Sequence, residues 1–346
     1  MLTSAVFKNF TTVPNDEFKF AKGLNVIVGA NGLGKSHILK AIYSLLKVQS
    51  GKNVELTKAF LEKAYAEKLV GVMRPEELGR LVKRKRGSER CELALTMKAA
   101  KQSTRIAFAN RAKSQVEVAT VPSEALPLSP VFLPTRELVT LSPWFVPLYD
   151  NFHLEFEETW RDTVSLLGAP SVKGPREKTV KTLLAPLEEA MNGKLTVDSK
   201  TGRFYLSVAG GGDMEMPLVA EGVRKLVMLA RLISTGVLLE QGYLFWDEPE
   251  TNLNPKLIRT VAASIIHLAN HGIQIFVATH SLFLLRELEI LSAQPDMKGI
   301  STRYFGLHSV DSLVTVAQGE KLEDVGNIAA LDESLMQSDR YLDLEQ

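Results

Sequence analysis

The sequence predicts an α/β fold, with a mixed or parallel sheet built from both ends of the chain, an antiparallel β-meander lobe and a helical lobe. A glycine-rich loop, residues 29–36, follows the apolar run Leu24–Val28 and precedes a segment with helical periodicity. Far down the chain, two more apolar runs, Gly242–Trp246 and Ile273–Ala278, enclose a helical segment, Pro255–Asn270. Strands that alternate with helices are typical of a parallel sheet.

The residues between these ends predict the two lobes. A charged helical pattern from Val54 to Leu81 ends in the basic cluster Lys83–Arg86. Three short segments alternate apolar and polar side chains, as antiparallel strands do: residues 91–98, 104–110 and 115–121. A second helical region covers residues 137–190, and turn signals then predict a hairpin, at Asn192-Gly193, Thr201-Gly202 and Gly210–Gly212.

Composition and charge exclude several classes of protein. The chain has 346 residues, 45% of them hydrophobic, so it can bury a sizeable core. Its 41 basic and 40 acidic residues give a formal charge of +1, which offers no global reason to expect a nucleic-acid or membrane partner. Cys91 is the single cysteine, so there is no intramolecular disulfide. The N-terminus does not resemble a secretion signal and no stretch resembles a membrane span; we expect a cytoplasmic protein.

The strongest motif is the glycine loop, which fits the phosphate-binding pattern in its required place between a strand and a helix. Its backbone N–H groups and the helix N-terminus favour phosphate oxygens, Lys35 is expected to reach the β- and γ-phosphates, and the Ser36 hydroxyl to bind Mg²⁺. The predicted nucleotide-binding residues of the loop are Gly29, Ala30, Asn31, Gly32, Leu33, Gly34, Lys35 and Ser36.

Two further apolar strands end in polar side chains. The strand before Asp247 and Glu248 predicts a site in which Asp247 binds Mg²⁺ and Glu248 orients or deprotonates the attacking water. A solvated loop is the alternative interpretation. His280 follows the next strand, where it is expected to contact the γ-phosphate; a lone histidine there is otherwise structural. Glu248, Lys35 and His280 are the predicted catalytic residues.

Several segments together resemble a known family. These are the loop with Asn31, the stretch Asp247–Glu250 followed by ThrAsnLeuAsnPro, the strand end Thr279–Ser281, and the opening PheLysAsnPhe. They resemble the ABC-type ATPase heads of the RecF/SMC and OLD-like group, and especially the compact bacterial AAA-type ATPases of antiphage defence modules. The resemblance is strong over residues 1–47 and 218–281 and looser between. It implies ATP and Mg²⁺ as cofactors and an ATPase with slow turnover; adenine specificity rests on it alone.

The resemblance also implies a division of the chain. Residues 1–346 are expected to form a single bilobed ATPase head. Its expected parts are a nucleotide-binding core (1–50 and 218–310), a helical insertion (51–90), an antiparallel β region (91–134) and a helical lobe with a hairpin (135–217).

A homodimer or higher homo-oligomer with ATP sandwiched between subunits is a further implication. The matching signature segment holds Ala220, Glu221 and Gly222 at a predicted helix start. Ala220 stands where such heads commonly have a serine, so backbone N–H groups, with Arg224 or Lys225, are left to contact the phosphate of the partner subunit. A plain amphipathic helix start is the alternative.

The glutamine loop of such heads has no counterpart in this sequence. The segment that ends in Arg136 and Glu137 occupies its place, so either side chain is a candidate substitute, and a surface ion pair is the alternative. The Lys83–Arg86 cluster is a candidate DNA contact or a solvated tip.

Three functions remain open. The first is an ATP-driven switch that controls a separately encoded effector, such as a nuclease or toxin, in antiphage defence; the residues after His280 hold no nuclease-like cluster. The second is a RecF/SMC-like ATP-driven DNA clamp in repair or recombination. The third is a structural scaffold stabilised by ATP. We favour the switch.

Overall fold

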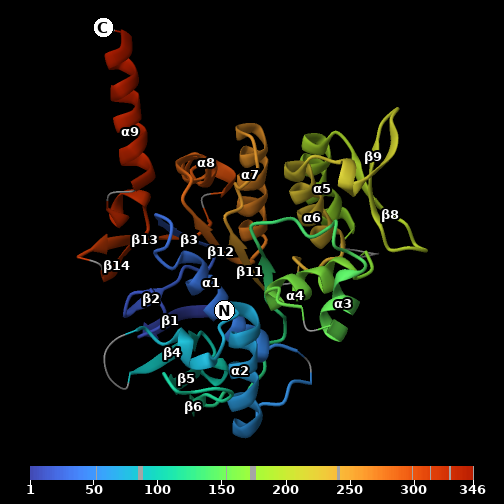
Figure 1. The fold of residues 1–346 in the computed structure, drawn as a ribbon. Coiled ribbons are helices and arrows are strands. Elements are labelled where there is room, and N and C mark those ends of the chain that lie inside the picture. Colours follow the sequence, from blue (N-terminus) through green and yellow to red (C-terminus); the bar gives the residue numbers. More distant parts are fainter. Residues whose placement is uncertain are drawn as a thin grey trace.

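The computed structural model describes residues 1–345 except 52, 85–88, 153, 172–176, 240, 241, 298, 312, 327 and 328. Lys85 and Arg86, half of the predicted basic cluster, lie outside the described residues. The chain forms two large sheets with helix α1 (Lys35–Val48) between them (Figure 1). No helix in the described ranges has the length and apolar character needed to cross a membrane.

The central sheet has six strands in the order β14-β13-β3-β12-β11-β7. All neighbours are parallel except β13 and β14. Its strands are β3 (Leu24–Gly29), β7 (Val131–Leu133), β11 (Tyr243–Asp247), β12 (Gln274–Thr279), β13 (Thr302–Val310) and β14 (Leu313–Gly319). The mixed α/β architecture agrees with the prediction, and the two ends of the chain meet in this sheet.

The second sheet is antiparallel, with five strands in the order β2-β1-β4-β5-β6. Its strands are β1 (Leu2–Lys8), β2 (Asp16–Lys19), β4 (Arg90–Met97), β5 (Thr104–Ala109) and β6 (Glu117–Thr120). A third, small sheet in the order β10-β9-β8 lies beside the helical lobe: β8 (Lys194–Val197), β9 (Phe204–Val208) and β10 (Gly212–Glu215).

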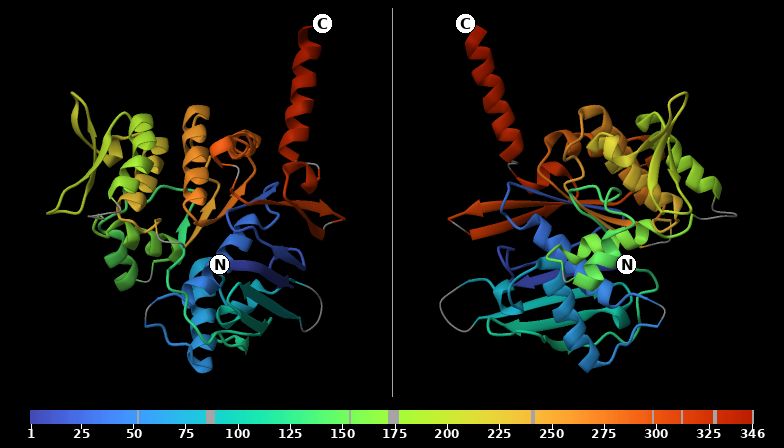
Figure 2. Two further views of the ribbon diagram at one scale, coloured as in Figure 1. Left: turned by 180° about the vertical axis from the view of Figure 1, so that it is seen from behind. Right: turned by 45° about the vertical axis from the view of Figure 1, so that its right-hand side comes forward.

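The helices cover both faces of the central sheet and form the lobe beside it (Figures 1 and 2). Besides α1, the α-helices of the described residues are α2 (Lys58–Met73), α3 (Phe145–Phe152), α4 (Glu158–Leu167), α5 (Glu177–Met191), α6 (Glu221–Ser234), α7 (Pro255–Asn270), α8 (Leu282–Ser292) and α9 (Ala329–Leu342). Short 3₁₀ helices cover Leu78–Leu81, Ala100–Gln102, Met216–Leu218, Pro295–Met297, Leu322–Val325 and Asp343–Glu345. Helix α9 projects away from the body of the molecule (Figure 1).

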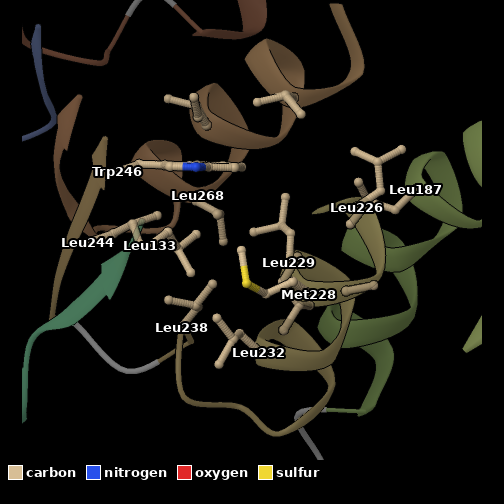
Figure 3. Packing of buried hydrophobic residues seen from close by; sticks show 14 of the residues in the cluster. Leu133, Leu187, Leu226, Met228, Leu229, Leu232, Leu238, Leu244, Trp246 and Leu268 are labelled. Carbon is tan, nitrogen blue, oxygen red and sulfur yellow. The ribbon is translucent and has the colours of Figure 1, made fainter. Parts of the chain in front are cut away.

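Two hydrophobic clusters sandwich the central sheet, because alternate residues of a strand point to opposite faces. On β11, Phe245 packs toward α1 and the antiparallel sheet, whereas Leu244 and Trp246 pack toward the helical side. Figure 3 shows this second cluster, in which Trp246 and Leu268 lie near Met228 and Leu229 of α6. Helix α6 is therefore packed directly against the strand that carries Asp247.

Two strands lie elsewhere than predicted. The opening strand β1, placed in the nucleotide-binding core with residues 1–50, pairs instead with β4 of the antiparallel sheet, as in Val6 opposite Ala94. Its outward Thr3 and Lys8 are exposed, which suits a sheet with one solvated face. Strand β7, placed in the antiparallel region 91–134, is fully buried and runs parallel to β11. An all-apolar run of three residues fits the buried parallel sheet better.

Candidate functional site

The phosphate-binding loop lies between β3 and α1, as predicted. Gly32 (φ 84°) and Gly34 (φ 94°) take left-handed backbone conformations that side chains disfavour. Gly34 also caps α1, and a Cβ there would lie 3.0 Å from the Thr12 hydroxyl oxygen. The glycines thus let the loop turn tightly into the helix N-terminus, whose free N–H groups favour an anion.

Lys35 is folded back across this loop. Its Nζ donates to the carbonyl oxygens of Gly29 (2.8 Å) and Ala30 (3.1 Å). Burial lowers the pKa of Lys35, and the nearby carboxylates of Glu248 and Asp247 partly counteract this. The ammonium group therefore lies between the loop and the paired acids, where it can exchange loop carbonyls for phosphate oxygens.

Ser36 and Asp247 meet across the site. The Ser36 hydroxyl donates to Asp247 Oδ1 over 3.0 Å. Asp247 ends β11, is buried, and has a raised pKa, mainly because burial disfavours its charge. A hydroxyl and a carboxylate at this distance are oxygen donors of the type that Mg²⁺ uses together with phosphates and water. No group of three or more His, Cys, Asp or Glu side chains suited to a metal occurs in the described ranges. Mg²⁺ commonly has only one or two protein ligands besides phosphates and water, and Ser36 and Asp247 fit that chemistry.

Glu248 and His280 form the third part of the site. His280 Nδ1 lies 3.1 Å from Glu248 Oε1, and the Glu248 N–H donates to the carbonyl of Ala278 at 2.8 Å. Glu248 itself has φ 45°, a conformation uncommon outside glycine and one that clusters at functional sites. The parallel ends of β11 and β12 therefore bring together Asp247, Glu248 and His280 as the sequence predicted.

Glu250 also lies at this edge of the sheet, although its place in the sequence indicated no role for it. Its carboxylate is buried, and its Oε1 accepts a hydrogen bond of 2.5 Å from Thr279 Oγ1 and lies 3.8 Å from His280 Nδ1. Its Oε2 is buried without a hydrogen-bond partner among the described residues. The only sequence signal was a second acid two residues after Glu248.

The signature segment begins helix α6 and lies apart from the phosphate loop of its own chain. Ala220 is the N-cap and supplies no side-chain hydrogen bond. Gly222 packs against the chain after β11, where a Cβ would lie 2.8 Å from the carbonyl oxygen of Asn252. No hydrogen bond or ion pair within the described ranges joins Ala220, Glu221 or Gly222 to the phosphate loop.

Arg224 and Lys225 differ from the prediction, since both are committed within the chain. Lys225 is 2% exposed, and its Nζ donates to the carbonyls of Glu248 (3.3 Å), Pro249 (3.3 Å) and Thr251 (2.9 Å). Burial lowers the pKa of Lys225 to about 8, although Glu250 and other carboxylates raise it in part. Neither side chain is therefore a free cation for a partner's phosphate.

Arg224 pairs with Glu137, one of the two candidate substitutes for the glutamine loop. Its Nε lies 3.0 Å from Glu137 Oε1, and its guanidinium donates to the carbonyl of Val219 at 3.0 Å. Glu137 is buried and also accepts from the Thr140 N–H and hydroxyl. The alternative of a surface pair between Arg136 and Glu137 is wrong, because the partner of Glu137 is on α6; Arg136 itself is exposed.

This fold and site define a compact ABC-type, RecF/SMC-like ATPase. Residues 111–286 match the family described as "AAA domain, putative AbiEii toxin, Type IV TA system", and residues 6–120 match a second AAA domain family. The first match covers 176 of the 346 residues (286 − 111 + 1), which is more than half of the chain. The chain therefore belongs to this AAA domain family.

Curated relatives match over a short region. The DNA replication and repair protein RecF of Salmonella arizonae is 30% identical over 76 residues, and that of Salmonella typhimurium is 32% identical over 76 residues. Each match covers 22% of this chain and 21% of RecF, so only about a fifth of the relatives' length is represented.

Solved structures match over nearly the whole chain. An Smc head bound to the C-terminal winged-helix domain of ScpA has a TM-score of 0.57 at 15% identity, covering 93% of this chain and 98% of the other. An Smc head with an extended coiled coil, bound to the C-terminal domain of ScpA from Pyrococcus furiosus, has a TM-score of 0.53 at 13% identity, covering 98% and 99%. At these identities the likeness is one of fold.

Proposed function

We propose that this ATPase is a switch that dimerises around ATP, hydrolyses it slowly and controls a separately encoded effector in antiphage defence. One observation carries the proposal: the Ser36–Asp247 contact (3.0 Å) and the Glu248–His280 contact (3.1 Å) lie at one edge of the sheet, beside Lys35. This arrangement supports separate side chains for magnesium placement, water activation and phosphate contact, the tasks that hydrolysis of a nucleoside triphosphate requires.

In the proposed mechanism, the loop N–H groups and Lys35 bind the phosphates. Lys35 gives up the carbonyls of Gly29 and Ala30 for the β- and γ-phosphate oxygens, which places its charge against theirs. Ser36 and Asp247 would hold Mg²⁺, whose charge lowers the cost of the negative charge on the phosphates. Asp247 would hold the ion as a carboxylate, and a bound cation would offset the burial that raises the pKa of this group.

Glu248 then acts on the water that attacks the γ-phosphate. Its carboxylate accepts the proton or orients the water, while His280 Nδ1 holds Glu248 Oε1 in place. His280 Nε2 would contact the γ-phosphate, so one ring would contact both the base and the phosphoryl group that is transferred to water. His280 would in this way report whether the γ-phosphate is present.

Dimerisation would complete the site from the partner subunit. The N–H groups of Ala220, Glu221 and Gly222 at the start of α6 are proposed to contact the γ-phosphate in trans, with no side-chain hydroxyl at Ala220. Since Lys225 binds the backbone of Glu248, a shift of α6 on dimerisation would be felt at the catalytic carboxylate.

The defence role draws support from the family description, which names a putative toxin and a type IV toxin–antitoxin system. Pull-downs from native cells test it, using Glu248→Gln protein loaded with Mg-ATP and the same protein with ADP. A co-encoded nuclease, toxin or other effector retained only with ATP is the expected result. Capture that does not depend on the nucleotide would contradict the switch.

A DNA clamp is the second candidate, favoured by the similarity to RecF. It predicts that duplex DNA stimulates ATP hydrolysis and that the stimulation falls steeply with salt, because phosphate contacts release counterions. Measuring ATP turnover with and without duplex DNA at low salt distinguishes the two functions. No effect of DNA on turnover would contradict the clamp and favour the switch, whereas recovery of repair proteins in the pull-down would favour the clamp.

A further inference from the structure

A basic groove, defined by Lys19, Lys22, Arg303 and Lys321, lies at the start of strands β3 and β13. It encloses a volume of about 840 Å³. Strand β3 runs from Leu24, next to the groove, to Gly29 in the phosphate loop. At about 3.3 Å per residue, roughly 17 Å of strand separates the two. The groove is therefore distinct from the nucleotide site.

The segments that carry the cations are held in place by specific contacts. The Ser301 hydroxyl accepts hydrogen bonds from the N–H groups of Lys22 (3.1 Å) and Gly23 (3.2 Å). On the other side, Gln318 Oε1 accepts from the Lys19 N–H at 3.1 Å, and Gln318 Nε2 donates to the Glu17 carbonyl at 2.8 Å. Strand β2 is thereby fixed to β14, and residues 22–23 are fixed to the residue before β13, so the groove is preorganised and a ligand need not order it.

The cations are poorly compensated. Arg303 Nε and Thr302 Oγ1 are buried without a hydrogen-bond partner in the described part of the chain. Lys19 and Lys22 have no carboxylate within ion-pair distance among the described residues, whereas Lys321 pairs with Glu323 at 3.1 Å. Buried polar atoms without partners are rare in folded proteins, so the unpartnered atoms of Thr302 and Arg303 single out this end of β13.

The lining also sets the shape and charge of what fits. Four cations face two carboxylates, Glu289 and Glu320, and Lys321 is paired with Glu323, which leaves a formal excess of +1 (4 − 3). Phe20 and Ile300 supply apolar surface between the charged groups. A volume of this size is within the range of small-molecule sites, which run from about 300 to 1,000 Å³.

We propose that the basic groove binds a small, elongated anion that bears two or more phosphate or carboxylate groups and has an apolar part against Phe20 and Ile300. The guanidinium of Arg303 binds one anionic group in a forked contact, and the Lys19 and Lys22 ammonium groups bind another. The carboxylates of Glu289 and Glu320 lie in the lining of the same groove. The site is separate from ATP hydrolysis and does not depend on it.

Calorimetric titration with 2,3-bisphosphoglycerate, which carries two phosphates and a carboxylate, tests the proposal. It is done without Mg²⁺ or nucleotide at low salt. We expect one site, at least tenfold weaker binding in Arg303→Gln and in the double variant Lys19→Ser/Lys22→Ser, and weaker binding as salt rises. The double variant alters exposed side chains only, so it keeps the test valid if Arg303→Gln fails to fold.

Two controls make the test specific. Lys98→Ser/Lys101→Ser removes the same charge from exposed positions elsewhere, and Lys35→Ala disables the phosphate loop; neither is expected to change the affinity. Absence of binding, equal weakening in the Lys98/Lys101 variant, or loss in Lys35→Ala would each overturn the proposal. A hexaglutamate peptide that binds more tightly than the probe would also overturn it and indicate an acidic peptide as the occupant.

Discussion

Replacing Lys225 by methionine tests how α6 is joined to the catalytic edge. Three backbone carbonyls accept from Lys225 Nζ, and burial lowers its pKa from 10.5 to about 8. Because the pKa of Lys225 is lower in the folded state, the folded protein loses this proton at a lower pH than the unfolded chain does. Between pH 8 and 10.5 the unfolded chain therefore binds the extra proton, and the free energy of unfolding rises with pH. Over the full interval, at about 1.4 kcal/mol per pH unit, the gain is about 3 kcal/mol.

Lys225→Met lacks this titration, so the wild type should gain about 2 kcal/mol of stability relative to the variant between about pH 7.5 and 9.5. Urea denaturation of both proteins at each pH measures the difference. Lys98→Met, which removes an exposed lysine, is the matched control and should keep a constant difference from wild type. A constant difference for Lys225→Met as well would contradict the lowered pKa, and with it the desolvated position of the Lys225 ammonium beside Glu248.

Three further variants test the roles at the site. Lys35→Ala should abolish binding of a fluorescent ATP analogue, since the loop then lacks its cation; unchanged binding would contradict its contact with phosphate. Asp247→Asn should lose the Mg²⁺ dependence of ATP binding measured by titration with and without EDTA, whereas a retained dependence would place the ion elsewhere. Ala220→Ser should strengthen the ATP-bound dimer and stabilise α6 by about 1 kcal/mol through a new N-cap, both measurable by sedimentation and thermal unfolding; a weaker dimer would contradict the proposed trans contact.

Much of the catalytic edge follows from sequence because parallel strands end at the same edge of a sheet. The glycine loop after β3, the acids after β11 and the histidine after β12 were each recognisable as a polar group at the end of an apolar strand. Their order along the chain then predicts that these side chains lie close together, and Glu248 Oε1 and His280 Nδ1 are 3.1 Å apart.

The rest of the fold and of the site depends on side-chain contacts and strand pairings that the spacing of residues in the sequence does not reveal. Lys225 and Arg224 resemble free cations in a signature segment, yet one binds three carbonyls and the other a buried glutamate on the chain after β7. The opening strand β1 precedes β3 in sequence but pairs with β4, because antiparallel pairing is decided by matching faces and not by order along the chain. The basic groove joins residues 19–22 to three segments between residues 289 and 321, so no local pattern predicts it.

Light scattering of the Glu248→Gln protein tests the central claim most directly. This variant should bind ATP and stall before hydrolysis, with turnover reduced by about 100-fold or more, because the group that activates water is lost. We expect twice the monomer mass with Mg-ATP and the monomer mass with ADP, and a monomer with either nucleotide for a variant that also carries Lys35→Ala. A mass that is the same with ATP and ADP would contradict an ATP-driven dimerising switch.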